Sequence, residues 1–266
     1  MAEKSIIIIG AGLAGLSTGC YAQMNGYRTQ IFEHHTMPGG VCTAWKRNGY
    51  TIDGCIAWLM GHKPGHPLYQ FYRELGTAQA NRFFDLTSYA KFIDEASGRS
   101  IEITTDLGKL ERELKAISPV DSKTVDELIA GSRAMQKFNW VVDKPRELSG
   151  WFDKLKQTWR MRGGLKYFSK YMMSSEDFVK QVEVPFLRQV IMNLFQPETP
   201  VVFLMMILGC FSAGYCGTIE GGSLNFVLPI EKRYKELGGQ VTYKSTVEEI
   251  LVENDCAVGV RLADGS

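Results

Sequence analysis

The sequence predicts an α/β fold in which a parallel-sheet domain, built from both ends of the chain, carries an inserted, mostly helical α+β domain. Three observations predict it. Near the N-terminus an apolar strand runs through a glycine-rich turn into a helix, and a further helix and strands follow residue 220. The stretch between them is mostly helical in pattern, with proline breaks. We expect residues 1–60 and 216–266 to form the sheet domain, and residues 61–215 the inserted domain.

The first expected element is a short strand at residues 6–9, a run of four isoleucines that suits a parallel strand buried on both faces. It leads directly into Gly10-Ala11-Gly12-Leu13-Ala14-Gly15. In such a turn the first glycine makes the tight bend, the second lets the backbone approach a pyrophosphate, and the third lets the helix lie close to the strand. The N–H groups and the positive end of that helix would bind the phosphates.

The following helix and second strand complete a βαβ unit. Apolar residues recur at helical spacing, and Asn25-Gly26 predicts the end of the helix. The second strand ends at Glu33, 21 residues after Gly12. A carboxylate there can accept hydrogen bonds from both ribose hydroxyls and would repel a 2′-phosphate, which disfavours NADP. Because all these parts occur in the required order, we favour an ADP-binding unit over a chance turn between strand and helix.

Two glycine-containing segments follow the acid: Pro38-Gly39-Gly40-Val41-Cys42-Thr43 and Gly49-Tyr50-Thr51-Ile52-Asp53-Gly54. Adjacent glycines let backbone amides close on a second phosphate or on the edge of a flavin. At these residues the chain resembles the FAD-dependent oxidoreductases with a double-glycine motif, the superfamily of phytoene desaturases, carotenoid isomerases and amine oxidases. One residue departs from the pattern. The position after the double glycine, usually arginine, is Val41 here, so a cationic contact to the cofactor is missing or replaced.

The resemblance implies FAD as cofactor and a Rossmann-like FAD-binding domain of the double-glycine type (GR2). It also implies that Glu220-Gly221-Gly222-Ser223 and the helix after it return the chain to that domain, and that Val247, in the pattern Val-x-x-Ile, lies beside the adenine. The expected cofactor contacts are Gly10, Ala11, Gly12, Leu13, Ala14, Gly15, Glu33, His34, Gly39, Gly40, Val41 and Val247.

Cysteine and histidine positions do not predict a further site. Disulfide reductases of the same FAD fold carry a cysteine just after a double glycine and a second one five positions later, but here position 47 is arginine and the next cysteine is Cys55. We therefore expect Cys42 to be a small, semi-buried residue. The six cysteines lack the paired spacing of a zinc site or a disulfide framework. His62 and His66 flank a proline and a glycine, which favours turn residues over a metal pair.

In the inserted domain we expect a hairpin at 89–105, a helix capped by Asp106 and ending at Ile117, and another that opens at Asp121 and runs towards Phe138. Residues 151–173 interleave basic and aromatic side chains, which suits peripheral contact with an anionic membrane. A cap helix with inward-packed aromatics and solvated lysines is the favoured alternative. The 13-residue apolar run at 201–213 is too short to span a bilayer, and we expect a buried helix or the lining of an apolar substrate tunnel.

Composition sets the remaining limits. With 266 residues, 45% of them hydrophobic, the chain can bury a large core in two lobes. The net charge of +1 gives no general attraction to nucleic acid. We expect a cytoplasmic protein, since the first strand begins too early for a secretory leader. The last residues, Ala263-Asp264-Gly265-Ser266, look like a hairpin turn without its partner strand, whereas the family continues further, so we expect a fragment.

For function, the resemblance implies hydride transfer between FAD and a small lipophilic unsaturated substrate, such as a carotenoid, a retinoid or another isoprenoid. An FAD-dependent amine oxidase, which differs mainly in substrate polarity, and a non-catalytic dinucleotide-binding fragment are the alternatives. No nucleophile–base pair, metal cluster or paired carboxylate stands out, so we predict no catalytic residue. The sequence does not predict the substrate itself, the reaction direction, the electron acceptor or the oligomeric state.

Overall fold

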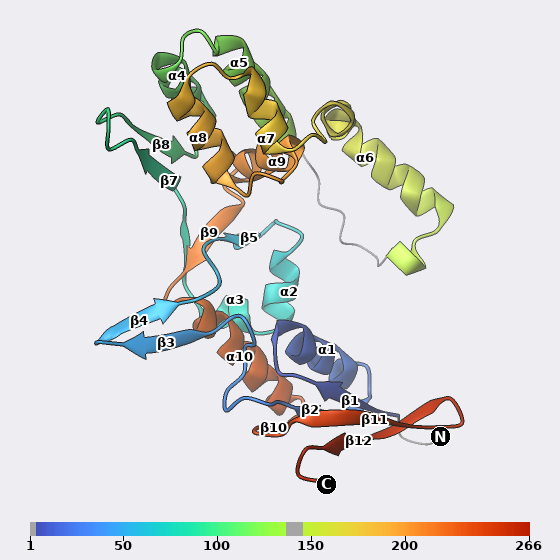
Figure 1. Cartoon of the computed structure of the whole chain (residues 1–266). Helices are drawn as coiled ribbons and strands as arrows, with labels where there is room; N and C mark the ends of the chain where they lie inside the picture. The colour runs from blue at the N-terminus through green and yellow to red at the C-terminus, as the bar shows by residue number, and fades with distance from the viewer. Residues whose placement is uncertain (1–3, 137–145) are drawn as a thin grey trace. The chain divides into compact units, whose positions relative to one another are not determined.

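The computed structural model describes residues 4–136 and 146–266. It divides into two compact units, Met1–Phe84 with Thr218–Ser266, and Asp85–Gly217 (Figure 1). The first unit thus contains the two ends of the chain, and the second is inserted between them. The expected α/β class with a mostly helical insertion is confirmed.

The first unit is organised around a parallel sheet of three strands, in the order β1-β2-β10. Its strands are β1 (Ser5–Ile9), β2 (Arg28–Phe32) and β10 (Gln240–Thr242), in a register that pairs Ser5 with Arg28 and Gln240 with Gln30. The crossover helix α1 (Leu13–Met24) connects β1 to β2, and α10 (Ser223–Glu236) leads into β10. This is the βαβ arrangement that the N-terminal pattern predicts.

Helices α1 and α10 pack against each other, and Tyr234 of α10 belongs to the hydrophobic core that they share. Its ring is fully buried, and its hydroxyl is 2.8 Å from the hydroxyl of Thr29 in β2. The close approach depends on Gly19 of α1, where a Cβ would lie 2.6 Å from the tyrosine ring. Tyr234 therefore fixes the distance between both helices and the sheet.

Burial of the first strand differs from the expectation. Ile8 faces the core, but Ile7 and Ile9 are 42% and 52% exposed. Alternate residues of a strand point to opposite faces, and in the described part of the chain the helices cover one face of this sheet. The prediction of a strand buried on both faces is therefore wrong for β1.

Two antiparallel hairpins belong to the first unit. One pairs β3 (Ala44–Arg47) with β4 (Tyr50–Asp53), joined by Asn48 and Gly49, both with positive φ. The other pairs β11 (Val247–Glu253) with β12 (Cys256–Leu262) through a turn at Asn254 and Asp255. The unit also contains two short helices, α2 (Tyr69–Glu74) and α3 (Thr77–Ala80), and a short strand, β5 (Leu59–Met60). Strand β5 forms a sheet with β9 (Cys216–Ile219) and β6 (Phe83–Asp85), in the order β5-β9-β6.

The second unit begins with the expected hairpin, β7 (Ser88–Ile93) with β8 (Ser100–Thr104), and the expected helix α4 (Leu107–Ile117). The Asp106 carboxylate caps α4 by accepting hydrogen bonds from the N–H groups of Gly108 and Lys109. The remaining elements are α5 (Ser122–Met135), η1 (Arg146–Leu148), α6 (Trp151–Lys170), α7 (Ser175–Phe178), η2 (Val179–Gln181), α8 (Pro185–Leu194) and α9 (Val201–Ser212). The expected end of α5 near Phe138 lies outside the described residues.

Asp121 does not cap α5 with its side chain as expected. Its buried carboxylate instead accepts hydrogen bonds from the Ser118 hydroxyl and from the N–H groups of Glu183 and Val184, at 2.5, 2.8 and 3.1 Å. Burial alone would raise the pKa of this carboxyl, but these bonds hold it below its usual value. Asp121 therefore ties the start of α5 to the segment before α8.

The apolar run at residues 201–213 and the basic and aromatic stretch at residues 151–173 differ in burial. Helix α9 is almost entirely buried and packs on α5, so the buried-helix expectation is confirmed. In α6, Trp151, Phe152 and Trp159 are 66%, 69% and 63% exposed, so the expectation of inward-packed aromatics is wrong for them. Among the described helices, none is long and apolar enough to cross a membrane.

Candidate dinucleotide-binding site

The glycine turn lies at the carboxyl end of β1, where the chain enters α1. Gly10, with a φ of +96°, donates its N–H to the carbonyl of Phe32 at 2.7 Å, which joins the turn to β2. A Cβ built on Gly15 would overlap the carbonyl oxygen of Gly10 and lie 3.2 Å from the Ile8 side chain. The third glycine of the motif therefore lets the first turn of α1 press against the strand.

Glu33 lies directly beside this turn. Its side chain is buried, and its two carboxylate oxygens accept the N–H groups of Ala11, at 2.6 Å, and His35, at 2.7 Å. Its backbone is held by β10 and the segment after it: the Glu33 N–H donates to Thr242, and the Ser245 N–H donates to the Glu33 carbonyl. Carboxyl ends of neighbouring parallel strands thus place the acid against the glycine turn.

The double glycine folds back onto the same turn. The N–H of Gly39 donates to the carbonyl of Ala11 at 2.9 Å, and Gly12 and Gly39 form a parallel bridge. A Cβ on Gly40 would lie 3.3 Å from the Cα of Gly12. The backbones of these glycines therefore pack directly on each other. The glycine turn, Glu33 and the double glycine, which were predicted separately from the sequence, meet at one edge of the sheet.

The remaining expected contact residues lie around this edge. His34 Nδ1 is 2.6 Å from the hydroxyl of Thr246, so the residue after the acid contacts the segment that carries the half-buried Val247. Leu13 is half-buried and Ala14 exposed in the first turn of α1. Val41, which follows the double glycine, is 81% exposed.

Asp53 connects the glycine-containing segment 49–54 to the segment 220–223. Its carboxylate accepts both the N–H and the hydroxyl of Ser223, each at 2.5 Å, and the N–H of Cys55 at 3.1 Å. Burial would raise the pKa of Asp53, but the bonds from Ser223 hold it below its usual value. The chain after the double glycine is thereby attached to the start of α10. Both segments were singled out from the sequence, but this contact between them was not predicted.

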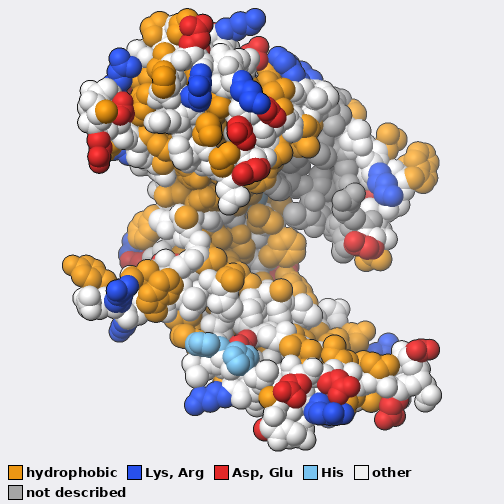
Figure 2. Space-filling view, viewed as in Figure 1, with side chains coloured by type: hydrophobic (Ala, Val, Ile, Leu, Met, Phe, Trp, Pro, Cys, Tyr) orange, Lys and Arg blue, Asp and Glu red, His pale blue; other side chains and the backbone are white. Residues whose placement is uncertain are grey.

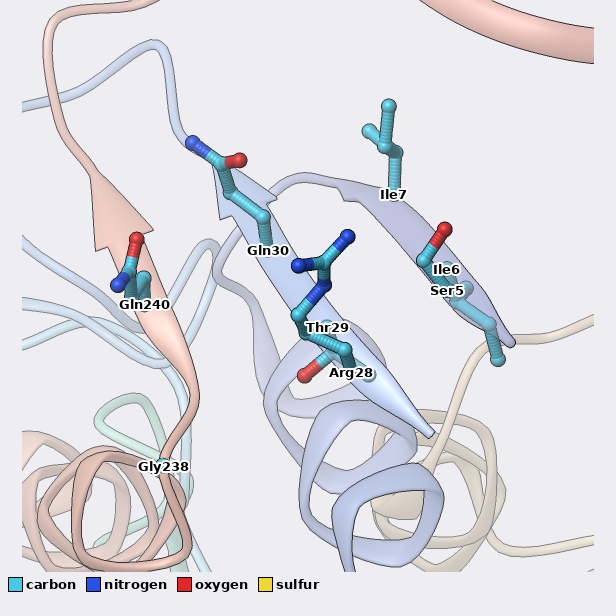
Figure 3. A pocket seen from close by; sticks show the side chains of 8 residues that line it. All are labelled: Ser5, Ile6, Ile7, Arg28, Thr29, Gln30, Gly238 and Gln240. Atoms are coloured by element: carbon cyan, nitrogen blue, oxygen red, sulfur yellow. The ribbon is translucent and has the colours of Figure 1, made fainter. Parts of the chain in front are cut away.

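A cavity of about 460 Å³ opens at the opposite end of the sheet. It is lined by Ser5, Ile6, Ile7, Arg28, Thr29, Gln30, Gly238 and Gln240. Figure 3 shows Ile7 and Gln30 on the sheet face away from the helices. These residues belong mainly to the amino halves of the strands, whereas ligands of open α/β sheets bind beyond the carboxyl ends. This cavity is therefore not the candidate dinucleotide site, which lies at the glycine turn.

The structure departs from the expectation for the cysteines and agrees with the expectation for the histidines. Cys42 is buried, but its sulfur lies 3.4 Å from that of Cys55, a pairing that the sequence analysis missed. His62 and His66 lie at a turn in which Gly61 and Gly65 have positive φ, as expected. Within residues 4–136 and 146–266, no group of three or more His, Cys, Asp or Glu side chains could hold a metal ion.

Comparisons with known proteins agree with this geometry. Residues 8–75 match the family model of an NAD(P)-binding Rossmann-like domain. The chain is 24% identical to the chloroplastic prolycopene isomerase of Daucus carota, over 99% of this chain and 44% of that protein. It is 23% identical to a lycopene-forming phytoene desaturase of Pseudescherichia vulneris, over 98% of this chain and 53% of that protein. The chain therefore spans about half the length of these curated relatives.

Among solved structures, the PF1083 protein of Pyrococcus furiosus superposes with a TM-score of 0.61 at 17% identity, over 98% of this chain and 56% of that one. At this identity the likeness shows the fold. Together, the Rossmann-like domain, the fold and the two curated relatives confirm the resemblance of the chain to the oxidoreductase superfamily that contains the phytoene desaturases and the prolycopene isomerase.

Proposed function

We propose that the first unit binds FAD, and that the chain contributes to an oxidoreductase that transfers hydride between flavin and a lipophilic unsaturated substrate. The observation that carries the proposal is the meeting of Gly12, Glu33 and the Gly39-Gly40 pair at the carboxyl edge of the parallel sheet. When bound, the flavin accepts or donates hydride. The described residues of the chain would bind and orient it.

The Glu33 carboxylate has enough hydrogen-bond acceptor positions to bind the adenosine half of FAD. An ionised carboxylate offers about four lone-pair positions, and the N–H groups of Ala11 and His35 occupy two of them. The remaining positions can accept the two hydroxyls of a ribose, while a 2′-phosphate would meet like charge. Val247, on the segment that His34 contacts, would lie beside the adenine.

The pyrophosphate would lie between the two glycine segments. The first N–H groups of α1 have no acceptor within the helix, as at any helix start, and they carry the positive end of the helix dipole. The bare backbone of Gly12 and Gly40 leaves room for phosphate oxygens that a Cβ at either position would restrict. Because Val41 replaces the usual arginine, the charge at this site would come from helix and backbone dipoles.

The substrate class is proposed from the named relatives, which are a prolycopene isomerase and phytoene desaturases. We assign substrate contact to the inserted unit, residues 85–217, which overlaps most of the substrate or cap domain that the sequence predicts at residues 61–215. Its most apolar element, α9, is buried within it. The test is to load the chain with FAD and to compare conversion of a carotenoid polyene with oxidation of a primary amine. Conversion of the polyene supports the proposal, and oxidation of the amine alone would favour an amine oxidase.

We further propose that the amino half of α6 contacts anionic membranes peripherally. Trp151, Phe152, Leu155 and Trp159 are each 60% exposed or more, next to Lys154 and Lys156. Figure 2 shows hydrophobic side chains at this end of the helix, at the right of the view. Exposed aromatics beside lysines suit the interface of an anionic bilayer.

The membrane contact is tested by co-sedimentation with phosphatidylserine vesicles. Replacing Trp151 and Phe152 by serine should weaken binding roughly tenfold, because two large apolar side chains are lost from the interface. Tyr50→Ser, a change of an equally exposed aromatic in the first unit, should leave binding unchanged. Equal binding by all three proteins would contradict the proposal.

A further inference from the structure

Two thiols face each other beside the double-glycine segment. The sulfur atoms of Cys42 and Cys55 are 3.4 Å apart, although the residues are 13 positions apart in the sequence. Cys42 is 3% exposed, whereas Cys55 is exposed to solvent. One sulfur of the pair is thus accessible from outside and the other is covered.

The register of the β3–β4 hairpin explains this pairing. Ala44 is paired with Asp53, and one residue further along, the N–H of Gly54 donates to the carbonyl of Thr43 at 3.1 Å. The next opposed positions are 42 and 55. A Cβ on Gly54 would lie 2.8 Å from the Trp45 ring, so a glycine there keeps the two chains close. Directly opposed side chains on antiparallel strands lie near enough for cysteines to bond.

Both cysteines are held by backbone hydrogen bonds. The N–H of Cys42 donates to the carbonyl of Gly39 at 3.0 Å, and the N–H of Cys55 donates to the Asp53 carboxylate. The next residue, Ile56, donates its N–H to the hydroxyl of Ser223 at 2.6 Å. Since both anchors are independent of the sulfurs, the thiols face each other before any bond forms.

We propose that Cys42 and Cys55 are a redox site that closes reversibly into a disulfide. A disulfide bond of about 2.0 Å requires the sulfurs to approach by about 1.4 Å, which side-chain rotation can supply. The oxidant is a small-molecule disulfide. The Cys55 thiolate attacks it and releases one small thiol, and the Cys42 sulfur then displaces the second small thiol from Cys55, with the Cys42 proton passing to the leaving sulfur.

The order of these steps follows from the different solvent exposure of the two thiols. Burial, together with the neighbouring Cys55, raises the pKa of the Cys42 thiol to about 12. Because the thiolate is the nucleophile in exchange, the exposed Cys55 reacts first with an external disulfide. Cys42 can react only with a disulfide already formed on Cys55.

The disulfide would affect the proposed FAD site because residues 39–42 carry both Cys42 and the double glycine. The Gly39 N–H binds the Ala11 carbonyl, so a bond from Cys42 to Cys55 fixes a segment that contacts the glycine turn. This consequence rests on the proposed function. Formation of the disulfide does not, and it is tested without FAD.

The experiment equilibrates the purified chain with an excess of oxidised glutathione and then blocks, digests and maps its thiols by mass spectrometry. Of the six cysteines in the sequence, we expect Cys42 and Cys55 to be recovered as one linked peptide pair and not as free thiols. Reduced glutathione should restore all six. Cys256→Ser, which removes another exposed cysteine, should leave the linked pair unchanged.

Two variants separate the proposal from simple surface oxidation. Cys55→Ser should abolish the link, and because this side chain is exposed its circular dichroism should match that of the parent chain. Cys42→Ser should stop the reaction at one glutathione on Cys55. In the parent chain, six remaining thiols, a stable glutathione adduct on Cys55, or a link between other cysteines would overturn the proposal. A chain that forms the disulfide but binds no FAD would contradict the proposed function alone.

Discussion

Replacing Gly15 by alanine tests the close contact between strand and helix on which the candidate site depends. The new Cβ would overlap the carbonyl oxygen of Gly10, a backbone atom that cannot rotate away. To relieve the overlap, α1 must move away from β1. This movement would also pull its first N–H groups away from the position proposed for the pyrophosphate.

The expected cost can be worked out from two opposing effects. Overpacking a tight contact typically costs about 1–3 kcal/mol, and the upper part of that range applies because the overlap involves backbone. Alanine in a helix gains up to about 1 kcal/mol over glycine. We therefore expect Gly15→Ala to lower the free energy of unfolding by about 2 kcal/mol, together with a clear loss of FAD affinity.

Urea unfolding followed by circular dichroism measures the first quantity. Gly108→Ala is the matched control, because Gly108 lies in the first turn of α4 and its added Cβ would meet only the ends of the Asp106 and Arg112 side chains, at 3.2 and 3.7 Å. The control should be unchanged or stabilised by up to about 1 kcal/mol. A Gly15→Ala chain as stable as the parent, with unchanged FAD affinity, would show that the site does not depend on the close contact between β1 and α1.

Three further changes test other contacts. Glu33→Gln should weaken FAD binding roughly tenfold, because charge-assisted bonds to the ribose are lost, which titration by flavin fluorescence would detect. Asp121→Ala should lower the free energy of unfolding by about 2 kcal/mol, because the N–H groups of Glu183 and Val184 lose their buried acceptor. Asp53 has a lowered pKa, so its stabilisation is present above its usual value of 3.8 and is lost as pH falls through the folded-state value. In urea unfolding at several pH values, the stability difference between the parent and Asp53→Asn should therefore shrink below about pH 3.8. A difference that is independent of pH would contradict this.

The N-terminal βαβ unit could be predicted because its determinants are local. The apolar strand, the glycine turn, the helix stop at Asn25-Gly26 and the acid at Glu33 all lie within one short segment of sequence. Their contacts follow from the geometry of a parallel strand pair with its crossover helix. Burial did not follow in the same way, because the exposure of Ile7 depends on which elements cover the second face of the sheet.

Contacts between distant segments were not predictable from pattern alone. Asp53 and Ser223 are 170 positions apart, and only the folded chain shows that one carboxylate holds the start of α10. Asp121 has the residue type and position of a helix cap, yet two N–H groups near residue 183 compete for its carboxylate. For Cys42 and Cys55 a signal was present, since Asn48-Gly49 defines the hairpin turn and hence the opposed positions.

Binding of FAD by the first unit is tested by the visible absorption spectrum of the purified chain, taken before and after addition of FAD and gel filtration. We expect flavin bands to remain with the protein after filtration, and excess ADP to reduce the flavin retained. A chain that stays colourless and also fails to bind ADP would contradict the assignment of the glycine turn, Glu33 and the double glycine to a dinucleotide. A colourless chain that binds ADP would retain the adenosine site but contradict the flavin proposal.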